Sequence, residues 1–317
     1  EAYGGQKILP LELNEMSDLW VSPYVLESAS RLNAVSKRRQ FSGALIREGA
    51  GYACIHSWPE LGDPSLAECL ADLRSKQVLP MVRRAMACAE VDGLARSEGR
   101  SLFNNVDVPP SHATLPEMSA LRLDETVEAG FNIVKLKSPD LELLRQLLVR
   151  FSTLRFRIDL NGTGHAEELV ALFLRWSEEE KARVDFLEDP ISFQPDHWKE
   201  LKESLGIPLA NDREAAADLG SDVLILKPAV DDLSMFMNRS ARIVVTSYMD
   251  HPLGQTFAAF EAARFRISEC CGLQTHGLFE KDAFTEALGP VAPSFSPPPG
   301  TGLGFDSLLE KLPWKKL

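Results

Sequence analysis

Charged residues stand at the ends of five successive strand-like runs in the middle of this chain, and their spacing strongly limits the possible folds. The runs are FNIVKLK, LRFRIDLNG, VDFLEDP, IPLANDRE and SDVLILKP, and the charged residues are Lys137, Asp159, Glu188, Asp212 and Lys227. Each run is rich in β-branched or large apolar side chains and stops at Pro, Gly or a polar residue, which is typical of buried parallel strands. The intervals between runs leave room for crossover helices. Repeated βα units of this kind predict a (β/α) barrel.

The length of the chain predicts a second, smaller part beside the barrel. The 317 residues exceed the roughly 200 to 250 that one barrel needs. We predict an α/β fold in which residues 101–285 form a (β/α)7β TIM-like barrel and residues 1–100 form an α+β capping domain. The proline-rich tail, residues 286–317, cannot build a core of its own, so we expect it to pack back on the cap.

Individual elements follow from their residue patterns. In the cap, QKILPLELN and FSGALIREGAGYACIHSW are strand-like, the second forming a hairpin around Glu48-Gly49-Ala50-Gly51, and two helical stretches follow. Residues 14–40 lack a strong pattern, which is typical of a binding loop. In the barrel, SLFNNVDV is predicted as strand one, followed by a helix ending at Gly130. ARIVVTSYMD and RISECCGLQT are predicted as strands seven and eight.

Composition excludes several classes of partner. The chain has 34 Lys and Arg against 46 Asp and Glu, a formal net charge of −12, so it lacks the basic surplus that binds nucleic acid. No apolar run is long enough for a membrane span, and the first residues do not resemble a signal peptide. We therefore expect a soluble, cytoplasmic protein with no obligatory protein partner. Its five cysteines are an odd number without a C-x-x-C motif, which favours free thiols.

Two lysines point in the same direction at the end of one predicted strand. Lys135 and Lys137 are two positions apart, and side chains alternate faces along a strand. Like charges close together disfavour protonation, so the pKa of Lys137 can fall toward the range in which an amine acts as a base. The alternative is that both lysines are solvated at the strand end.

The three acids are candidate ligands for a divalent cation. Asp159, Glu188 and Asp212 would converge from adjacent strands and offer hard oxygen ligands suited to Mg²⁺. Each acid also has a simpler explanation: a turn at Asp159, a loop at Glu188 and a helix cap at Asp212. Three successive strand ends that all carry an acid favour the metal site.

Lys227 completes the constellation from the other side of the predicted barrel. With a metal between them, Lys137 and Lys227 would face a bound substrate from opposite sides, an arrangement that suits removal of a proton α to a carboxylate. The six histidines include no H-E-x-x-H or H-x-H, so zinc hydrolysis is not favoured.

Taken together, these motifs resemble the enolase superfamily, in its muconate-lactonizing-enzyme subgroup. The matching stretches are K-L-K, R-I-D-L-N, F-L-E-D-P, N-D and L-K-P, in order through the whole barrel. Within the subgroup, G-A-L-I-R-E, H-S-W-P-E-L-G-D-P and S-Y-M-D-H-P-L-G-Q are most similar to the o-succinylbenzoate synthase family. That resemblance implies Mg²⁺-dependent dehydration of 2-succinyl-6-hydroxy-2,4-cyclohexadiene-1-carboxylate to 2-succinylbenzoate, a carbon-oxygen lyase reaction of menaquinone biosynthesis. Lys137 would carry the proton, and Lys227 would be a cation over the ring.

The resemblance also implies where the substrate binds, with two departures. Asn161, Ser247 and Tyr248 are the candidate contacts in the barrel, although the seventh-strand motif has fewer serines than is usual for the family. Arg213 follows Asp212 where the family often has Glu. A dianionic substrate needs local positive charge in a protein with a net negative charge. Arg38 and Arg39, in the predicted loop, are therefore also candidates for binding the substrate carboxylates.

Other functions remain open at this point. An N-succinylamino acid racemase or dipeptide epimerase of the same superfamily would need the same five residues, with Lys137 and Lys227 as bases on opposite faces. A non-catalytic barrel that binds a small anion is an alternative of another class, and an inert structural barrel would not need converging carboxylates.

Overall fold

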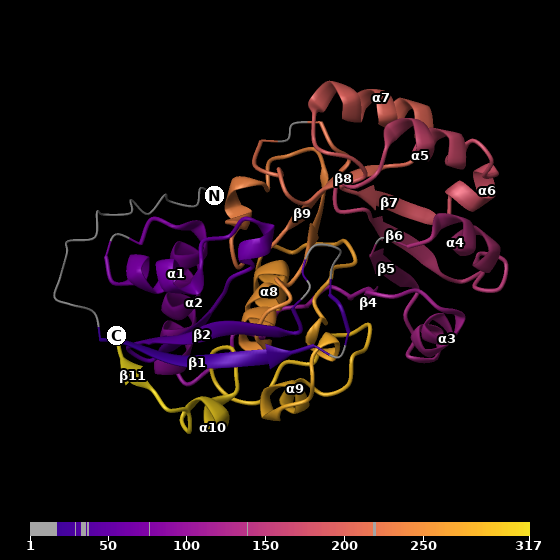
Figure 1. The fold of residues 1–317 in the computed structure, drawn as a ribbon. Coiled ribbons are helices and arrows are strands. Elements are labelled where there is room, and N and C mark those ends of the chain that lie inside the picture. Colours follow the sequence, from indigo (N-terminus) through magenta and orange to yellow (C-terminus); the bar gives the residue numbers. More distant parts are fainter. Residues whose placement is uncertain are drawn as a thin grey trace, which may run out of the picture.

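The computed structural model describes residues 18–28, 30–32, 36, 38–75, 77–137, 139–217 and 220–317. These residues form two sheets, and Figure 1 shows them as two lobes that share the long helix α8 (Pro252–Arg264) near their junction. One sheet is antiparallel with strand order β11-β1-β2-β3, and the other is parallel with order β10-β9-β8-β7-β6-β5-β4. The parallel order is the one expected when successive βα units are laid side by side.

The parallel sheet contains the five runs that carry the charged residues, as the sequence predicts. Its strands are β4 (Ala113–Leu115), β5 (Ile133–Lys137), β6 (Arg155–Asp159), β7 (Val184–Glu188), β8 (Leu209–Asn211), β9 (Val223–Leu226) and β10 (Arg242–Val245). The helices between them are α3 (Ala120–Glu128), α4 (Leu141–Leu147), α5 (Ala166–Phe173), α6 (Glu178–Lys181) and α7 (Pro195–Leu205). In the described part of the segment between β8 and β9 the chain makes turns and no helix.

Two predicted barrel strands are wrong in detail. The first strand is β4 rather than residues 101–108, where the chain makes turns and Asn105 has a left-handed backbone (φ 62°). The eighth is reduced to two single bridges, Thr246 to Gly272 and Cys271 to Ser111, which join the last strand to the chain just before the first. A Cβ on Gly272 would lie 2.8 Å from the ring of His112, so this close approach needs glycine.

The antiparallel sheet belongs to the cap. Its main strands are β1 (Leu19–Glu27), β2 (Gln40–Glu48) and β3 (Gly51–His56), covered by α1 (Leu66–Leu73) and α2 (Pro80–Ser97). The predicted hairpin is confirmed, because Glu48 pairs with Gly51 across a two-residue turn. The expectation of a loop over residues 14–40 is wrong for β1, which pairs with β2 along its whole length. Pro23 makes β1 hard to recognise as a strand from its sequence. This proline lies beyond the two residues of β1 that pair with β11, on an open edge where proline is tolerated. The run QKILPLELN lies outside the described residues.

The tail returns to the cap. It contains α9 (Ala283–Leu288), α10 (Asp306–Leu309) and β11 (Lys315–Lys316), and β11 pairs with the start of β1. The Arg96 guanidinium on α2 donates to the Asp306 carboxylate at 2.5 Å and to the Gly304 carbonyl at 2.8 Å. The carboxylate of Asp92, also on α2, accepts from the Leu303 amide at 2.6 Å. These contacts tie the last residues to the cap helix.

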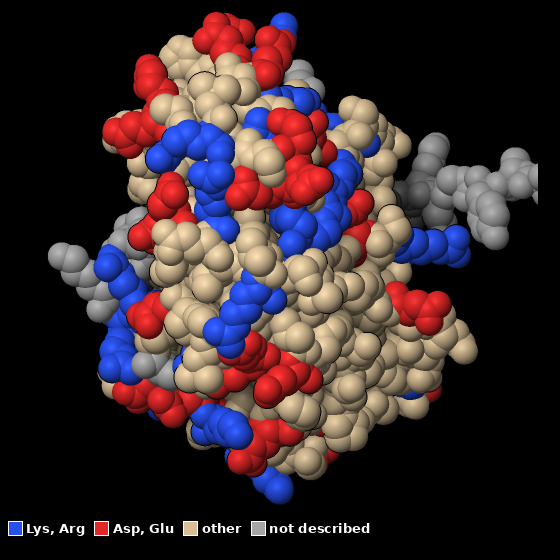
Figure 2. Space-filling view, turned by 90° about the vertical axis from the view of Figure 1, so that its right-hand side faces the viewer, with Lys and Arg blue, Asp and Glu red and all other residues tan. Residues whose placement is uncertain are grey.

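Three structural features bear on the predictions from composition: the cysteines, the helices and the distribution of surface charge. All five cysteines are free thiols. Among the described helices none is long and apolar enough to cross a membrane. On the face shown in Figure 2, Lys and Arg side chains are interspersed with Asp and Glu, and no continuous basic surface is visible there.

A buried carboxyl group lies where the cap meets the barrel. Asp250, between β10 and α8, is 2% exposed, and its Oδ1 atom has no hydrogen-bond partner among the described residues. Tyr24 and Cys54 of the cap sheet lie on the cap side of this interface, where the Tyr24 hydroxyl bonds the Nδ1 atom of His56 at 2.9 Å. Burial raises the pKa of Asp250 to about 7.

Asp250 should make the stability of the protein fall with rising pH. The folded state binds its proton more tightly than the unfolded state, so the free energy of unfolding should decrease from about pH 4 to about pH 7, by up to roughly 4 kcal/mol. Asp250→Asn stays neutral and should remove this decline. Urea unfolding of wild type and Asp250→Asn at pH 5 and pH 8 measures this decline. If the variant loses as much free energy of unfolding between the two pH values as wild type does, the assignment to Asp250 is contradicted.

A fully buried arginine crosses the interior of the barrel below the strand ends. Arg157 on β6 is 0% exposed, donates to the Asp185 carboxylate at 2.8 Å and to the Cys270 carbonyl at 2.7 Å, and lies over the ring of Phe186. It also meets the Nδ1 atom of His112 at 2.9 Å. Burial alone would raise the pKa of Asp185, but the neighbouring guanidinium groups lower it.

Removing this arginine should be costly. Arg157→Leu removes the fully buried partner of Asp185 and leaves this carboxylate with only two partly exposed arginines, Arg155 and Arg242, so it should lower the free energy of unfolding by about 3 to 5 kcal/mol. Arg155 contacts the same carboxylate at 3.1 Å, but its side chain is 50% exposed, so Arg155→Leu is the matched control and should cost less than about 1 kcal/mol. Denaturant unfolding compares them, and equal losses would show that burial of the pair does not matter.

Candidate active site

Lys135 and Lys137 project into the barrel from the end of β5, as predicted. The Lys135 ammonium lies 2.6 Å from Glu188 Oε1 and 3.2 Å from Asp159 Oδ2. The Lys137 ammonium is 3.7 Å from Asp159 Oδ2. Burial would lower the pKa of Lys135, but the carboxylates of Glu188 and Asp159 raise it instead. The pKa of Lys137 is lowered, first by burial and also by the charge of Lys135, while Asp159 acts in the opposite direction.

The three predicted acids lie on adjacent strand ends and are buried to different degrees. Asp159 and Glu188 end β6 and β7, and Asp212 directly follows β8. Burial would raise the pKa of Asp159, but Lys135 and Lys137 lower it to about 2. Glu188 behaves differently: burial raises its pKa to about 8, Lys135 opposes this, and the charges of Asp159 and Asp212 add to the rise.

Lys227 completes the group from the end of β9. Its ammonium lies 2.5 Å from Asp212 Oδ2 and 5.7 Å from the centre of the Tyr248 ring. Burial would lower the pKa of Lys227, but Asp212 raises it. The two lysines at the edges of the site are therefore held differently, because the ammonium of Lys227 lies 2.5 Å from its carboxylate and that of Lys137 lies 3.7 Å from its own.

All three lysines face one small cavity of about 50 Å³ between the barrel and the cap. Strand-end residues form its wall, and Trp58 and Leu61 of the cap line the opposite side. The complete lining is Trp58, Leu61, His112, Thr114, Lys135, Lys137, Asp212, Lys227, Thr246, Ser247, Tyr248, Met249, Gly272 and Thr275. Residues more than 200 positions apart in the chain thus meet at one site, as a barrel fold requires.

The predicted substrate-binding residues are only partly brought together. Ser247 and Tyr248 line the cavity, but the Ser247 hydroxyl bonds Thr275 at 2.6 Å and the Tyr248 hydroxyl donates to Asp63. Asn161, after β6, has a left-handed backbone (φ 53°), and its side-chain amide nitrogen is buried with no partner among the described residues.

The two arginines of the predicted loop do not line the cavity. Arg38 donates to the Glu60 carboxylate at 2.6 Å and 3.2 Å, and Arg39 donates to the carbonyl of Ser28 at 3.1 Å. Arg213, in place of the usual acid, lies 3.7 Å from Asp189.

Sequence reasoning missed several residues of the site. His112 and Thr246 line the cavity floor, and the Thr246 hydroxyl is buried without a partner in the described chain. Trp58 and Asp63 belong to the H-S-W-P-E-L-G-D-P stretch, which supports the resemblance to the family without indicating a role for either residue. Their position at the site could be recognised only from the fold, since nothing in their local pattern marks them as functional.

The chemistry of the acids fits a hard divalent cation such as Mg²⁺. The buried Oε2 atom of Glu188 has no hydrogen-bond partner among the described residues, and the charges of Asp159 and Asp212 oppose the ionisation of Glu188. As they stand, no three acid, His or Cys side chains of the described residues are close enough together to enclose an ion. The ammonium groups of Lys135 and Lys227 hold these carboxylates instead.

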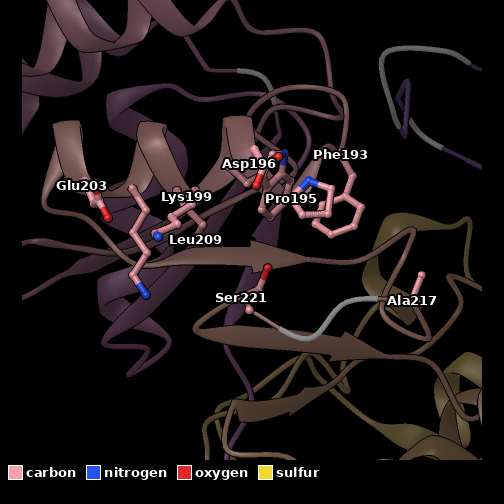
Figure 3. A pocket seen from close by; sticks show the side chains of 11 residues that line it. Phe193, Pro195, Asp196, Lys199, Glu203, Leu209, Ala217 and Ser221 are labelled. Atoms are coloured by element: carbon pink, nitrogen blue, oxygen red, sulfur yellow. The ribbon is translucent and has the colours of Figure 1, made fainter.

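A much larger cavity lies elsewhere, outside the barrel. It has a volume of about 570 Å³ and lies between α7 and the segments flanking β8 (Figure 3). Figure 3 shows Lys199 and Glu203 on α7 above Leu209 of β8, with Phe193 at one end. Its walls are mostly apolar, and it contains none of the predicted site residues. Charge chemistry, rather than size, therefore identifies the small cavity as the candidate active site.

Comparisons of the sequence with known proteins point to one family. Residues 19–95 match the family model described as O-succinylbenzoate synthase, N-terminal domain. An o-succinylbenzoate synthase of Bdellovibrio bacteriovorus is 31% identical, and the alignment covers 93% of this chain and 97% of that protein. An o-succinylbenzoate synthase of Mycobacterium tuberculosis is 28% identical over 58% of this chain and 63% of its own length.

Solved structures with the same fold are more distant in sequence. The L-Ala-D/L-Glu epimerase of Bacillus subtilis is 19% identical with a TM-score of 0.72, covering 92% of this chain and 98% of that one. The dipeptide epimerase of Cytophaga hutchinsonii, complexed with Mg and D-Ala-L-Val, is 14% identical with a TM-score of 0.72, covering 94% and 98%. A member of the enolase superfamily from Listeria innocua is 15% identical with a TM-score of 0.74, covering 95% and 97%. The extended identity to the Bdellovibrio enzyme shows that the chain belongs to the o-succinylbenzoate synthase family of the enolase superfamily.

Proposed function

We propose that this protein is an o-succinylbenzoate synthase that dehydrates 2-succinyl-6-hydroxy-2,4-cyclohexadiene-1-carboxylate to 2-succinylbenzoate in menaquinone biosynthesis. The observation that carries the proposal is the cavity lined by Lys137, Lys227 and Asp212, in a chain related over its length to an o-succinylbenzoate synthase. The other two strand-end acids, Asp159 and Glu188, pair with Lys135 in the wall of this cavity. The products are the aromatic dianion and water. We expect the enzyme to act in the cytoplasm.

The charges at the site favour a dianionic substrate. The carboxylates of Asp159, Glu188 and Asp212 lie beside the buried ammonium groups of Lys135 and Lys227. A divalent ion held by those carboxylates would add two positive charges, and a substrate with two carboxylates would balance them. The ion, when bound, would supply positive charge that stabilises the substrate carboxylate as it becomes more negative.

The two lysines have different roles in the proposed reaction. Lys137, as the neutral amine, removes the proton from the carbon next to the ring carboxylate, and negative charge moves onto the carboxylate oxygens. The Lys137 ammonium then returns this proton to the departing hydroxyl group, so that water leaves and the ring becomes aromatic. Lys227 stays positively charged and stabilises the negative charge on the substrate.

Racemisation is a second candidate, because both epimerases of Bacillus subtilis and Cytophaga hutchinsonii share this fold. A racemase needs a base on each face of the substrate. The direct pairing of Lys227 with Asp212 favours a fixed cation on one face, and so favours dehydration.

The proposed substrate and metal can be tested together. Wild-type protein with Mg²⁺ should convert the cyclohexadiene acid to a product with aromatic ultraviolet absorbance, and a chelator should abolish the conversion until Mg²⁺ is restored. Glu188→Gln should weaken Mg²⁺ binding measured by calorimetry by at least about tenfold, because a neutral amide replaces a charged ligand. Glu60→Gln, which changes a carboxylate of the cap that pairs with Arg38, is the control. Full turnover in metal-free protein would contradict the proposal.

The roles of the lysines predict different results for two variants. Lys137→Ala should abolish both dehydration and exchange of the α proton with deuterium from the solvent. Lys227→Arg keeps a positive charge but displaces it, so dehydration should fall by roughly tenfold or more while exchange by Lys137 persists. Nuclear magnetic resonance measures the exchange, with N-succinyl amino acids as the competing substrates. A racemase would instead lose interconversion in either variant and keep exchange of one enantiomer in each.

A further inference from the structure

A short segment of the cap holds Tyr248 of the barrel at two points. The segment is Trp58–Asp63, which follows β3 and contains the 3-10 turn η1 (Pro59–Leu61). The indole nitrogen of Trp58 donates to the Tyr248 carbonyl at 3.0 Å. The Tyr248 hydroxyl donates to the two carboxylate oxygens of Asp63 at 2.9 Å and 2.8 Å. The hydrogen bonds therefore run in both directions between cap and barrel.

Asp63 also fixes the shape of its own segment. Its Oδ2 atom accepts from the Trp58 amide at 2.8 Å, and its own amide donates to the Trp58 carbonyl at 3.3 Å. Trp58 is 1% exposed and packs against the ring of Phe41. The Asp63 carboxylate thus stabilises the turn of the cap segment and also bonds this segment to the barrel.

The tyrosine held in this way lies against Lys227. The ammonium of Lys227 is 5.7 Å from the centre of the Tyr248 ring, a distance at which the ring face attracts a cation. The other close contact of that ammonium is Asp212, which is a proposed metal ligand. A carboxylate shared with a cation holds the lysine less strongly, so the ring becomes more important for its position.

We propose that Asp63 and Tyr248 form a clasp between cap and barrel that positions Lys227 for the reaction. The kinetic part of this inference rests on the proposed dehydration, whereas the clasp itself does not. The Tyr248 hydroxyl is engaged by Asp63 and does not bind the substrate. Tyr248 and Asp63 are positioning residues, since they act through Lys227.

Hydrogen exchange tests the clasp without any turnover. In Tyr248→Phe and Asp63→Ala, amide exchange over residues 58–64, measured by mass spectrometry, should accelerate about tenfold or more, because a hydrogen bond to a charged group is lost. Asp63→Asn keeps an acceptor for the Trp58 amide and a partner for the phenol, and should stay within about threefold of wild type. Tyr24→Phe is the matched control: it also removes a buried tyrosine hydroxyl in the cap–barrel interface, but one bonded to His56. Unchanged exchange in Tyr248→Phe would overturn the clasp.

Kinetics test the effect on Lys227. Dehydration by Tyr248→Phe should have kcat reduced about fivefold or more, while exchange of the α proton by Lys137 continues. The double variant Tyr248→Phe/Asp63→Ala should be no slower than the slower single variant, because the two residues act as one unit. Tyr24→Phe should keep wild-type kcat. Equal losses of exchange and dehydration, or an unchanged kcat, would overturn the positioning role. Wild-type protein that does not dehydrate the acid would count against the proposed function alone, since the exchange data over residues 58–64 would still decide on the clasp.

Discussion

The mouth of the barrel depends on pairing buried carboxylates with buried ammonium groups. Glu188 is 1% exposed and Asp159 is 4% exposed, and an isolated ionised carboxylate at such depth would be very unfavourable. Lys135 lies between the two acids and offsets this cost, so its role is first of all electrostatic. The same pairing explains why Lys135 and Lys137, two residues apart on one strand, have opposite pKa shifts. The lysine closest to the acids takes the positive charge, and its neighbour is left able to lose its proton.

The rest of the fold brings these charged groups together at one edge of the parallel sheet, and the cap covers them. Parallel strands put the ends of β5 to β9 on one edge, and the buried Arg157 and Asp185 fill the interior below. Among its described residues, the cap adds no charged group to the cavity wall, but contributes Trp58 and Leu61. A site closed by apolar side chains excludes water, and this strengthens every electrostatic interaction inside it. Cap and barrel therefore both contribute to the cavity wall, and the three lysines that face the cavity come from the barrel.

The sequence predicts the strands that carry charge better than the elements that complete the molecule. The runs ending at Lys137, Asp159 and Glu188 are strongly apolar and end abruptly, so local pattern is sufficient. Closure of the barrel is different, because the run predicted as strand eight makes only single bridges, at Gly272 and Cys271, and local pattern cannot tell a single bridge from a full strand. Long-range contacts cannot be predicted from local pattern: Tyr248 and Asp63 are 185 positions apart, and either residue alone resembles an ordinary loop residue. The sequence predicts which strand ends meet at the cavity. It does not predict which of the side chains there are already hydrogen-bonded within the protein, as Tyr248 is.

Lys137 and Lys227, the two outer lysines of the site, differ in their surroundings. Lys137 and Lys227 occupy corresponding positions at the ends of β5 and β9, and a symmetric pair of bases would suit racemisation. Their surroundings are not symmetric. Lys227 lies 2.5 Å from a carboxylate and faces an aromatic ring, whereas Lys137 is 3.7 Å from Asp159 and is destabilised as a cation first by burial and also by Lys135. An ammonium stabilised from two sides is a poor base but a good fixed charge. In the proposed reaction, a substrate between them would meet an acceptor for its proton on one face and a cation on the other, which is what removal of water with one base requires.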